Sequence, residues 1–547
     1  MIRKILELLP QEYRLGCFKM AALVPVKAVL DLVGVAALIP VMLLVLEPGR
    51  LPFPAWTVLG GIVGVLIIKT VLSILITRFN IRYLMGLYRS LSSRAFASLF
   101  AKGLVYVKNN NSARMTFNVT GVCYNFVMCY LGGWMNLIGE IAFVLALFAG
   151  MMAYSMRATL LSVCAFVPGV LIYLFAVRKP LRQMGRRENE LRREQTRIVN
   201  ETFRGYSEVR VNDAFPMIMD RFTHGLEEIS TFRLRGSLIQ GIPSYLLELS
   251  VVVLVAVLTL ITLPEGSGTD GAVFLGICTV VMIKLLPAVR NILGCMSSIT
   301  ATKYTQEILG DMTTVPDKET RMEDVKPIPF KEKISLKSVT FAFDEDSAPV
   351  FRNFDLEIPK GCRLGVRGRT GAGKTTLFNI LLGLYTPQEG GLYVDDERIT
   401  PENLEQWHKI IGYVPQDVFI TDSTIIQNVA LGCDLDRIDR DKVIRALDKA
   451  SLMDFVNNLP DGIDTRIGEM GSKMSGGQRQ RLGIARALYK DASVLFFDEA
   501  TSSLDSQTES QVNKAVESLS SSDNSLTIIV ISHRESTLEF CDRILAL

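Results

Sequence analysis

The sequence contains 547 residues, of which 49% are hydrophobic and 21% are charged. This length allows more than one domain, and the formal net charge of +3 is too nearly balanced to indicate a nucleic-acid partner. The nine cysteines include no C-x-x-C pair, so we expect small buried side chains rather than a metal site or disulfides.

Long apolar segments dominate the first half of the chain, whereas the second half has the composition of a soluble α/β protein. A membrane-spanning helix needs about 20 mostly apolar residues. Six segments meet this requirement: Ala21–Leu46, Ala55–Thr77, Tyr130–Met152, Ala158–Val177, Ile239–Leu263 and Gly271–Cys295. We therefore predict an all-α transmembrane domain over residues 1–310.

The loops between these predicted spans differ in length and in charge. Those after the second and fourth spans, 78–129 and 178–238, together hold twenty Lys and Arg residues. The three short loops hold only Arg50 and Arg157. Because positively charged loops stay on the cytosolic side, we expect both long loops and both termini in the cytosol. The mixed charges of Arg186–Glu194, without Gly or Pro, predict that spans two and four continue as cytosolic helices.

Several ionisable side chains fall inside the predicted spans, where they indicate either a function or a pair within the protein. They are Lys27, Asp31, Lys69, Glu140, Glu248, Lys284 and Arg290. The four-residue spacing of Lys27 and Asp31 favours an ion pair between them, and Arg290 lies near the cytosolic interface. Lys69 and Lys284 lie about 20 Å from the outer ends of their spans. These two lysines either pair within the protein or line a cavity for an anionic group.

A second domain, predicted over 332–547, follows a polar linker at 311–331 that contains prolines. Its short strand Cys362–Arg367 leads into Gly368-Arg369-Thr370-Gly371-Ala372-Gly373-Lys374-Thr375-Thr376 and then into a helix with an apolar face. This is a G-x4-G-K-[ST] phosphate-binding loop in the strand–loop–helix context that it requires. It predicts ATP binding, with Lys374 on the β- and γ-phosphates and the Thr375 hydroxyl on Mg²⁺. The expected nucleotide-binding residues are Gly368, Thr370, Gly371, Gly373, Lys374, Thr375 and Thr376.

Two further apolar strands end in polar side chains. Ser493–Phe497 precedes Asp498 and Glu499, and Leu526–Ser532 precedes His533. Ligands of α/β proteins bind at the carboxyl ends of parallel strands. We therefore predict Asp498 as a Mg²⁺ ligand and Glu499 as the general base for an attacking water, with His533 and Lys374 beside it in the catalytic site.

The segment Met474-Ser475-Gly476-Gly477-Gln478 is a second helix start suited to phosphate, with Ser475 as the cap and two glycines that allow close approach. It resembles the signature of the ATP-binding-cassette (ABC) proteins, with Met474 where Leu is usual. The whole chain resembles the half-subunits of type IV ABC exporters. This resemblance implies a six-helix transmembrane domain with long cytosolic helical extensions, fused to an α/β P-loop ABC ATPase.

The resemblance also implies roles for single residues. Phe343 takes the place of the aromatic residue that stacks on adenine, and Gln416 that of the Q-loop residue that contacts Mg²⁺. His533 matches the H-loop, and Asp505 lies in a segment that resembles the D-loop. Four signature residues are expected to contact ATP held by a partner domain: Ser475, Gly476, Gly477 and Gln478. A further tail is implied after the strand beyond His533 and is missing from a chain that ends at Leu547.

A signature turn needs a phosphate loop opposite it, and this chain has one of each. The resemblance therefore implies a dimer with two ATP molecules and Mg²⁺ at the shared interface. Complete motifs favour a homodimer, and a heterodimer stays open. We expect an ATPase coupled to alternating-access export in the bacterial inner (plasma) membrane, surrounded by its lipids, with the ATP-binding domain in the cytoplasm.

The substrate is indicated by one short pattern. The segment Asp31-Leu32-Val33-Gly34-Val35-Ala36-Ala37-Leu38-Ile39-Pro40 resembles the acidic-x-x-Gly…Pro pattern of flippases for lipid-linked oligosaccharides of the PglK type. Lys69 and Lys284 suit a lipid pyrophosphate, so an amphipathic lipid-linked substrate with an anionic group is the first expectation. Multidrug, lipid and peptide export stay open. An ATP-gated channel or regulatory subunit is disfavoured by the intact Glu499.

Overall fold

The computed structural model describes residues 2–37, 54–154, 178–262, 268–312, 325–343, 347–468, 471–499 and 526–547, together with isolated positions between these ranges. The chain divides into two compact units. Met1–Lys102 and Tyr106–Asp317 form the first, a helical unit, and Gly103–Val105 and Lys318–Leu547 form the second, an α/β unit. The division between Asp317 and Lys318 falls inside the linker predicted at 311–331.

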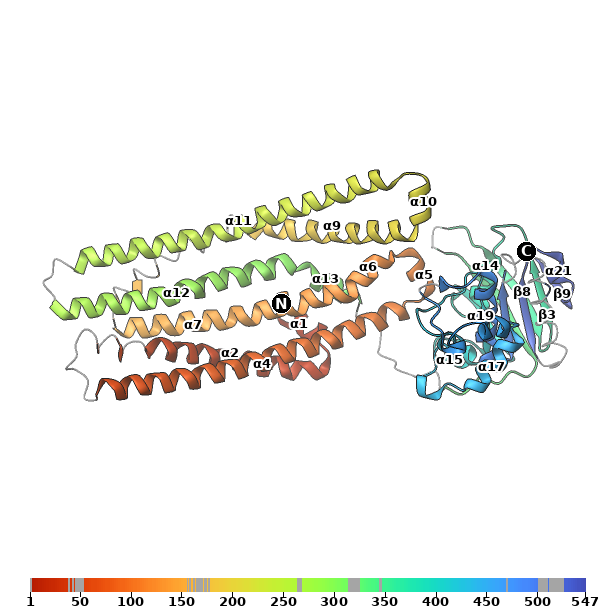
Figure 1. Cartoon of the computed structure of the whole chain (residues 1–547), viewed down its shortest axis with the longest axis horizontal. Coiled ribbons are helices and arrows are strands. Elements are labelled where there is room, and N and C mark those ends of the chain that lie inside the picture. The colour runs from red at the N-terminus through yellow and green to blue at the C-terminus, as the bar shows by residue number, and fades with distance from the viewer. Residues whose placement is uncertain are drawn as a thin grey trace. The chain divides into compact units, whose positions relative to one another are not determined.

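Long helices that run side by side make up the helical unit (Figure 1). In chain order its helices are α1 (Ile2–Leu8), α2 (Gln11–Ala36), α4 (Ala55–Ala101), α5 (Gly103–Asn109), α6 (Ser112–Phe117), the π-helices η1 (Asn118–Val122) and η2 (Asn125–Leu131), α7 (Gly132–Tyr154), α9 (Arg178–Arg204), α10 (Tyr206–Val211), α11 (Phe215–Thr262), α12 (Gly268–Thr302) and α13 (Tyr304–Met312). The 47 residues of α4 make a helix about 70 Å long, more than twice the thickness of a bilayer core. The predicted continuation of the second span beyond the membrane is thus confirmed.

Three described stretches are long and apolar enough to cross a membrane: Ala55–Ala101, Asn125–Ala153 and Thr279–Thr302. They contain the spans predicted second and third, and they overlap the sixth. The predicted span Ile239–Leu263 lies almost wholly in α11, whereas Ala158–Val177 and the end of Ala21–Leu46 lie mainly outside the described residues. Large apolar side chains of α4, such as Ile67 and Ile74, are exposed on this unit and suit contact with lipid.

The ion pair predicted within α2, between Lys27 and Asp31, is wrong. Asp31 Oδ1 instead lies 2.7 Å from Lys69 Nζ on α4. Gly34 lies against the stem of that lysine, since a Cβ added there would be 3.6 Å from Lys69 Cε. The neighbouring helix therefore supplies a closer cation to Asp31 than Lys27 on the preceding turn of α2. Of the two alternatives for Lys69, the structure shows pairing within the protein.

Three of the remaining ionisable side chains in the predicted spans, Glu140, Glu248 and Arg290, also have partners on other helices. Glu140 Oε1 on α7 accepts a hydrogen bond from Asn291 Nδ2 on α12, at 2.9 Å. Arg290 Nη2 lies 3.7 Å from Glu248 Oε2 on α11. Lys284 is exposed on α12, and it forms no ion pair within the described ranges. Of these polar contacts, Asp31–Lys69 thus joins α2 to α4, and Glu140–Asn291 joins α7 to α12.

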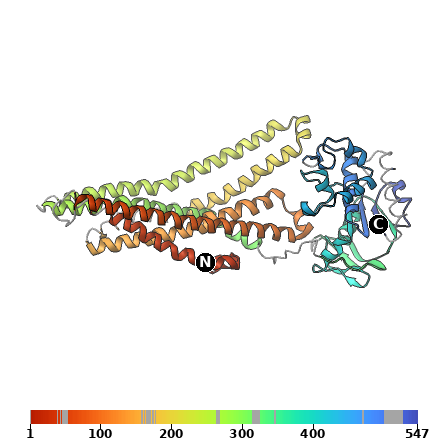
Figure 2. The same cartoon turned by 60° about the horizontal axis from the view of Figure 1, so that its bottom comes forward.

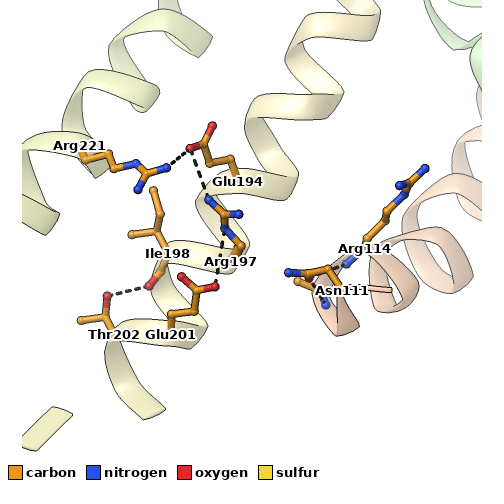
Figure 3. A network of polar contacts seen from close by, with 9 residues as sticks. Asn111, Arg114, Glu194, Arg197, Ile198, Glu201, Thr202 and Arg221 are labelled. Atoms are coloured by element: carbon orange, nitrogen blue, oxygen red, sulfur yellow. Dashed lines mark hydrogen bonds and ion pairs between the residues drawn. The ribbon is translucent and has the colours of Figure 1, made fainter. Parts of the chain in front are cut away.

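Helices α9 and α11 form a hairpin through α10, and ion pairs join its two arms. Glu194 Oε1 lies 2.6 Å from Arg221 Nη2 on α11, and Arg197 lies beside the same carboxylate on α9 (Figure 3). Two more pairs join the arms: Glu188 with Arg233 at 3.0 Å, and Arg187 with Glu228 at 3.1 Å. Exposed ion pairs contribute only about 0–1 kcal/mol each to the free energy of unfolding. We therefore expect these pairs to fix the register of the two arms rather than to stabilise the hairpin strongly. Figure 2 shows the hairpin leaning away from the other helices at its α10 end.

The α/β unit contains two sheets (Figure 1). The antiparallel sheet has the order β2-β1-β4-β5, with β1 (Lys333–Phe341), β2 (Phe351–Pro359), β4 (Glu389–Val394) and β5 (Glu397–Arg398). The parallel sheet has the order β6-β7-β8-β3-β9, with β3 (Arg363–Arg367), β6 (Ile411–Val414), β7 (Val494–Asp498), β8 (Thr527–Ile531) and β9 (Arg543–Ala546). Its helices are α14 (Lys374–Leu381), α15 (Leu404–Lys409), α16 (Ile425–Val429), α17 (Arg440–Lys449), α18 (Met453–Asn457), α19 (Gly476–Tyr489) and α21 (Glu535–Leu538), with short 3₁₀ turns at Leu435–Arg437 and Gly462–Asp464.

Apolar cores cover both faces of the parallel sheet, which is why all residues of β7 and β8 are buried. Phe496 faces a core shared with α14 and the antiparallel sheet. Its neighbours Leu495 and Phe497 face the opposite core, with α16, α17 and α19. Ile531 of β8 pairs with Asp498 on one side and Val366 on the other. The carboxyl ends of β3, β7 and β8 therefore meet at one edge of the sheet.

Candidate nucleotide site

The loop between β3 and α14 has the geometry of a phosphate cradle. Gly371 and Gly373 have φ values of +86° and +95°, which only glycine adopts readily. A side chain at Gly373 would also clash, because an added Cβ would be 2.8 Å from Val350 Cγ1. Lys374 is buried, and its Nζ donates to the carbonyl oxygens of Gly368 at 2.9 Å and Arg369 at 3.1 Å. The ammonium group thus lies inside the curve of the loop.

Next to this loop, three predicted site residues meet around one carboxylate. Glu499 Oε2 accepts a hydrogen bond from Gln416 Nε2 at 3.2 Å, and Glu499 Oε1 lies 3.1 Å from His533 Nε2. Glu499 follows β7 directly, and it has a φ of +48°, a strained conformation for a non-glycine residue. Its backbone N–H is held by Ile531 O at 3.0 Å. The two partners and this backbone bond fix the direction in which the carboxylate points.

Asp498 has a partner that the motifs did not indicate. It is the last residue of β7 and is only 8% exposed. The Tyr413 hydroxyl, on the adjacent strand β6, donates a hydrogen bond to its carboxylate. Burial, followed by the charge of Asp498, raises the pKa of Tyr413 to about 12, so the phenol stays a donor at neutral pH. The apolar sequence around Tyr413 could have suggested a buried phenol that needs an acceptor, but not which one.

The signature turn forms the start of α19. Ser475 Oγ accepts from the backbone N–H of Gln478 at 3.2 Å, and the Gln478 side chain accepts from Ser475 N at 2.8 Å, which makes a capping box. The predicted cap is thus confirmed. Met474, which replaces the usual Leu, is buried in the core beside α19. Within the described part of this chain, no hydrogen bond joins this turn to the Gly368–Thr376 loop.

The remaining predicted residues occupy the same unit. Phe343 is 45% exposed and stands edge-on to Phe341 and Tyr385, with ring centroids 5.3 and 5.8 Å away. Its ring is thus held by two aromatic neighbours and keeps one face accessible for stacking on a base. Thr375 is exposed at the start of α14, where Thr376 is buried. Thr370 lies in the loop, and Asp505 lies outside the described residues.

A P-loop, a strand-end carboxylate pair and a capped glycine turn, in one chain with a membrane-spanning helical unit, define an ATP-driven membrane protein. Comparisons with known proteins agree. A family model described as ABC transporter matches residues 351–502. A Ralstonia nicotianae protein named ATP-dependent lipid A-core flippase is 30% identical over 503 residues, covering 90% of this chain and 83% of that protein. A Cupriavidus pinatubonensis protein of the same name is 31% identical over 451 residues, covering 80% of this chain and 74% of that protein.

The fold is also that of a solved transporter. A bacterial Atm1-family ABC exporter with ATP bound superposes with a TM-score of 0.77 at 23% identity, covering 98% of this chain and 93% of the other. The chain belongs to the ABC transporters: it is a half-subunit in which a transmembrane helical unit is fused to an ABC ATPase unit. It is an integral membrane protein that binds nucleotide and hydrolyses ATP to drive transport. The family and the fold class predicted from the sequence are confirmed.

Proposed function

We propose that two copies of this chain form a homodimeric flippase that moves a glycolipid from the cytosolic to the outer side of the bacterial inner membrane. The observation that carries this proposal is the similarity to a lipid A-core flippase over 503 residues, because it extends across both units. The positive charge of the two long loops supports the orientation, with the ATPase unit in the cytoplasm. The complete set of motifs in one chain supports the homodimer.

The chemistry follows from the side chains at the sheet edge. The loop N–H groups and Lys374 would bind the β- and γ-phosphates, and Phe343 would stack on the adenine. Glu499 would take a proton from the water whose oxygen attacks the γ-phosphorus, so that ADP leaves. Gln416 and His533 would hold the Glu499 carboxylate toward that water. Such a site favours a hydrolysing transporter over an ATP-gated channel or regulatory subunit, which does not need a positioned base.

The residues around Asp498 fit a Mg²⁺ ion. Thr375, Gln416 and Asp498 offer a hydroxyl, an amide carbonyl and a carboxylate, the hard oxygen donors that Mg²⁺ prefers. Asp498 is buried at the carboxyl end of β7, where its direction is set by the strand and by Tyr413. When bound, the ion would neutralise charge on the β- and γ-phosphates.

Replacing Tyr413 with Phe should raise the Mg²⁺ concentration at half-maximal ATPase activity about 10–150-fold, because a hydrogen bond to a charged group contributes about 1.5–3 kcal/mol. The rate at saturating Mg²⁺ should change by less than about threefold, since Tyr413 only positions Asp498. Steady-state phosphate release across a Mg²⁺ titration measures both. Tyr393→Phe, which removes a hydroxyl from β4 in the other sheet, is the matched control. An unchanged Mg²⁺ dependence would refute the positioning role.

Transport requires closure of the two ATPase units on each other. The Ser475–Gln478 turn of one copy would complete the phosphate site on the Gly368–Thr376 loop of its mate. ATP would then hold the two units together, and hydrolysis would release them. Alternation between these two states would expose the substrate-binding cavity of the transmembrane helices first to the cytosolic side and then to the outer side of the membrane.

The decisive test is lipid flipping by the purified full chain in liposomes. Fluorescent glycolipid should move between leaflets when ATP is added outside, and dithionite quenching follows that movement. A fluorescent lipophilic drug cation and a hydrophobic peptide serve as comparison substrates. Faster transport of either comparison substrate than of glycolipid would transfer the function to multidrug or peptide export, and ATP-evoked single-channel currents would indicate a channel.

A further inference from the structure

A small polar cavity lies among the transmembrane helices of the helical unit. Its volume is about 60 Å³, and its polar lining consists of Lys27, Asp31, Asn80, Asn136 and Glu140. Val24, Ala28, Met135, Gly139 and Phe143 complete the wall. This volume holds a few water molecules or hydroxyl groups but not a whole sugar ring. Ionisable groups at such a place indicate a binding function by default.

The cavity lies at the depth of the cytosolic leaflet. At ~1.5 Å per residue, Lys69 and Glu140 are each about 20 Å from the outer ends of α4 and α7. Asn80 is nearly 40 Å from the outer end of α4, which places it beyond the cytosolic edge of a bilayer core about 30 Å thick, at the level of the lipid headgroups. The headgroup of a lipid that enters from the cytosolic side would reach this level first.

Charges in and beside the cavity balance. Lys69 is neutralised by Asp31 at 2.7 Å, and Glu140, which faces the same cavity as Lys27, is hydrogen-bonded to Asn291 at 2.9 Å. A phosphate placed here would meet two carboxylates and no excess of positive charge. The sequence expectation of a pyrophosphate held by Lys69 therefore has no support from this arrangement, since the lysine is already paired.

Unused hydrogen-bonding groups remain in the cavity wall. Asn80 lines the cavity, and its Oδ1 is buried with no hydrogen-bond partner among the described residues, so a turn of the amide toward the cavity would give this oxygen a partner in a bound hydroxyl. Asn136 is exposed to the cavity one turn of α7 before Glu140. Amides and carboxylates together offer donors and acceptors, which is what a hydroxyl requires because it does both. Hydroxyl groups of a sugar, which both donate and accept hydrogen bonds, therefore fit this wall better than a phosphate, which only accepts them.

Resting on the proposed glycolipid flipping, we propose that this cavity recognises an uncharged, hydroxyl-bearing edge of the lipid headgroup and selects sugar-bearing lipids over lipids whose headgroup is a phosphate alone. Asn80 and Asn136 supply hydrogen bonds to the hydroxyls. Asp31 and Lys69 pair with each other beside Gly34, so neither charge is free to bind a charged headgroup. The cavity then acts as the specificity filter of the flippase.

The test compares two lipids with identical acyl chains on the full chain in phosphatidylcholine nanodiscs: diglucosyl diacylglycerol and phosphatidic acid. Stimulation of ATPase activity should reach half its maximum at a roughly tenfold lower mole fraction of the glycolipid. Asn136→Leu and Asn80→Leu should each raise that mole fraction about tenfold for the glycolipid and leave the value for phosphatidic acid unchanged. Thr70→Val is the matched control, since it removes an exposed α4 hydroxyl that, within the described residues, donates to Leu66 O of its own helix alone.

Equal stimulation of the unmodified chain by phosphatidic acid would overturn the selectivity without the use of any variant. Variants that keep the glycolipid dependence unchanged would overturn the role of the cavity. If neither lipid stimulates ATPase activity or is flipped, the proposed function itself fails and the filter falls with it. If both lipids are flipped equally well, the proposed selectivity of the cavity fails but the proposed flippase function stands.

Discussion

Replacing Glu499 with Gln should lower ATP turnover by roughly 10²–10⁴-fold while the chain continues to bind ATP. The carboxylate is held by Gln416 at 3.2 Å and by His533 at 3.1 Å, next to the loop that holds the phosphates. The amide keeps the size of the side chain and one acceptor oxygen but takes no proton, so we expect the chemical step to be affected far more than ATP binding. Because hydrolysis is what separates the two copies, the variant should also stay dimerised in ATP. Phosphate release, fluorescent ATP binding and crosslinking of the two copies measure the three effects.

Glu539→Gln provides the control for this substitution, since that exposed carboxylate makes no side-chain hydrogen bond or ion pair within the described residues. It should turn over ATP at the normal rate. His533→Ala should have a smaller effect than Glu499→Gln, because it removes only one of two side-chain partners of the carboxylate. Near-normal turnover by Glu499→Gln would defeat the general-base assignment, and a much larger loss in His533→Ala than in Glu499→Gln would move the base to His533.

The site was predictable where its geometry is local. The phosphate loop depends on glycines whose positive φ values are set within a few residues, and the Ser475–Gln478 capping box closes within one helical turn. The meeting of Glu499 and His533 was predictable too, because parallel strands place their carboxyl ends at one edge. In each case, the contact is determined by residues that are close in sequence or by the common direction of parallel strands.

Contacts between distant elements were not predictable in the same way. Asp31 has a lysine one turn away on its own helix, yet it pairs with Lys69 because the rotation and packing of α2 and α4 bring that ammonium closer. The same holds for the Tyr413–Asp498 hydrogen bond, which depends on β6 being the neighbour of β7. Helix rotation and strand order follow from the whole core, which no short pattern encodes.

Replacing Lys374 with Ala should weaken ATP binding about 10–150-fold and remove measurable turnover, because the ammonium group supplies charge-assisted hydrogen bonds worth about 1.5–3 kcal/mol. Lys374 also donates to Gly368 O and Arg369 O, so its loss removes two bonds that shape the loop. Lys374→Met keeps the apolar stem but loses the charge and both hydrogen bonds, so it separates the packing of the stem from the contribution of the ammonium group. Equilibrium titrations with ATP and with adenosine are the measurement, since adenosine has no phosphate for the loop to bind.

Both variants should lose affinity for ATP while their weak affinity for adenosine, carried by Phe343, stays the same. Lys449→Ala, at the exposed end of α17, is the control and should bind and hydrolyse ATP normally. If Lys374→Met binds ATP as tightly as the unmodified chain but Lys374→Ala does not, the lysine acts through the packing of its stem rather than through its ammonium group. Unchanged ATP affinity and turnover in both variants would mean that the nucleotide phosphates are not held by this loop, and the ATP site would have to be sought elsewhere.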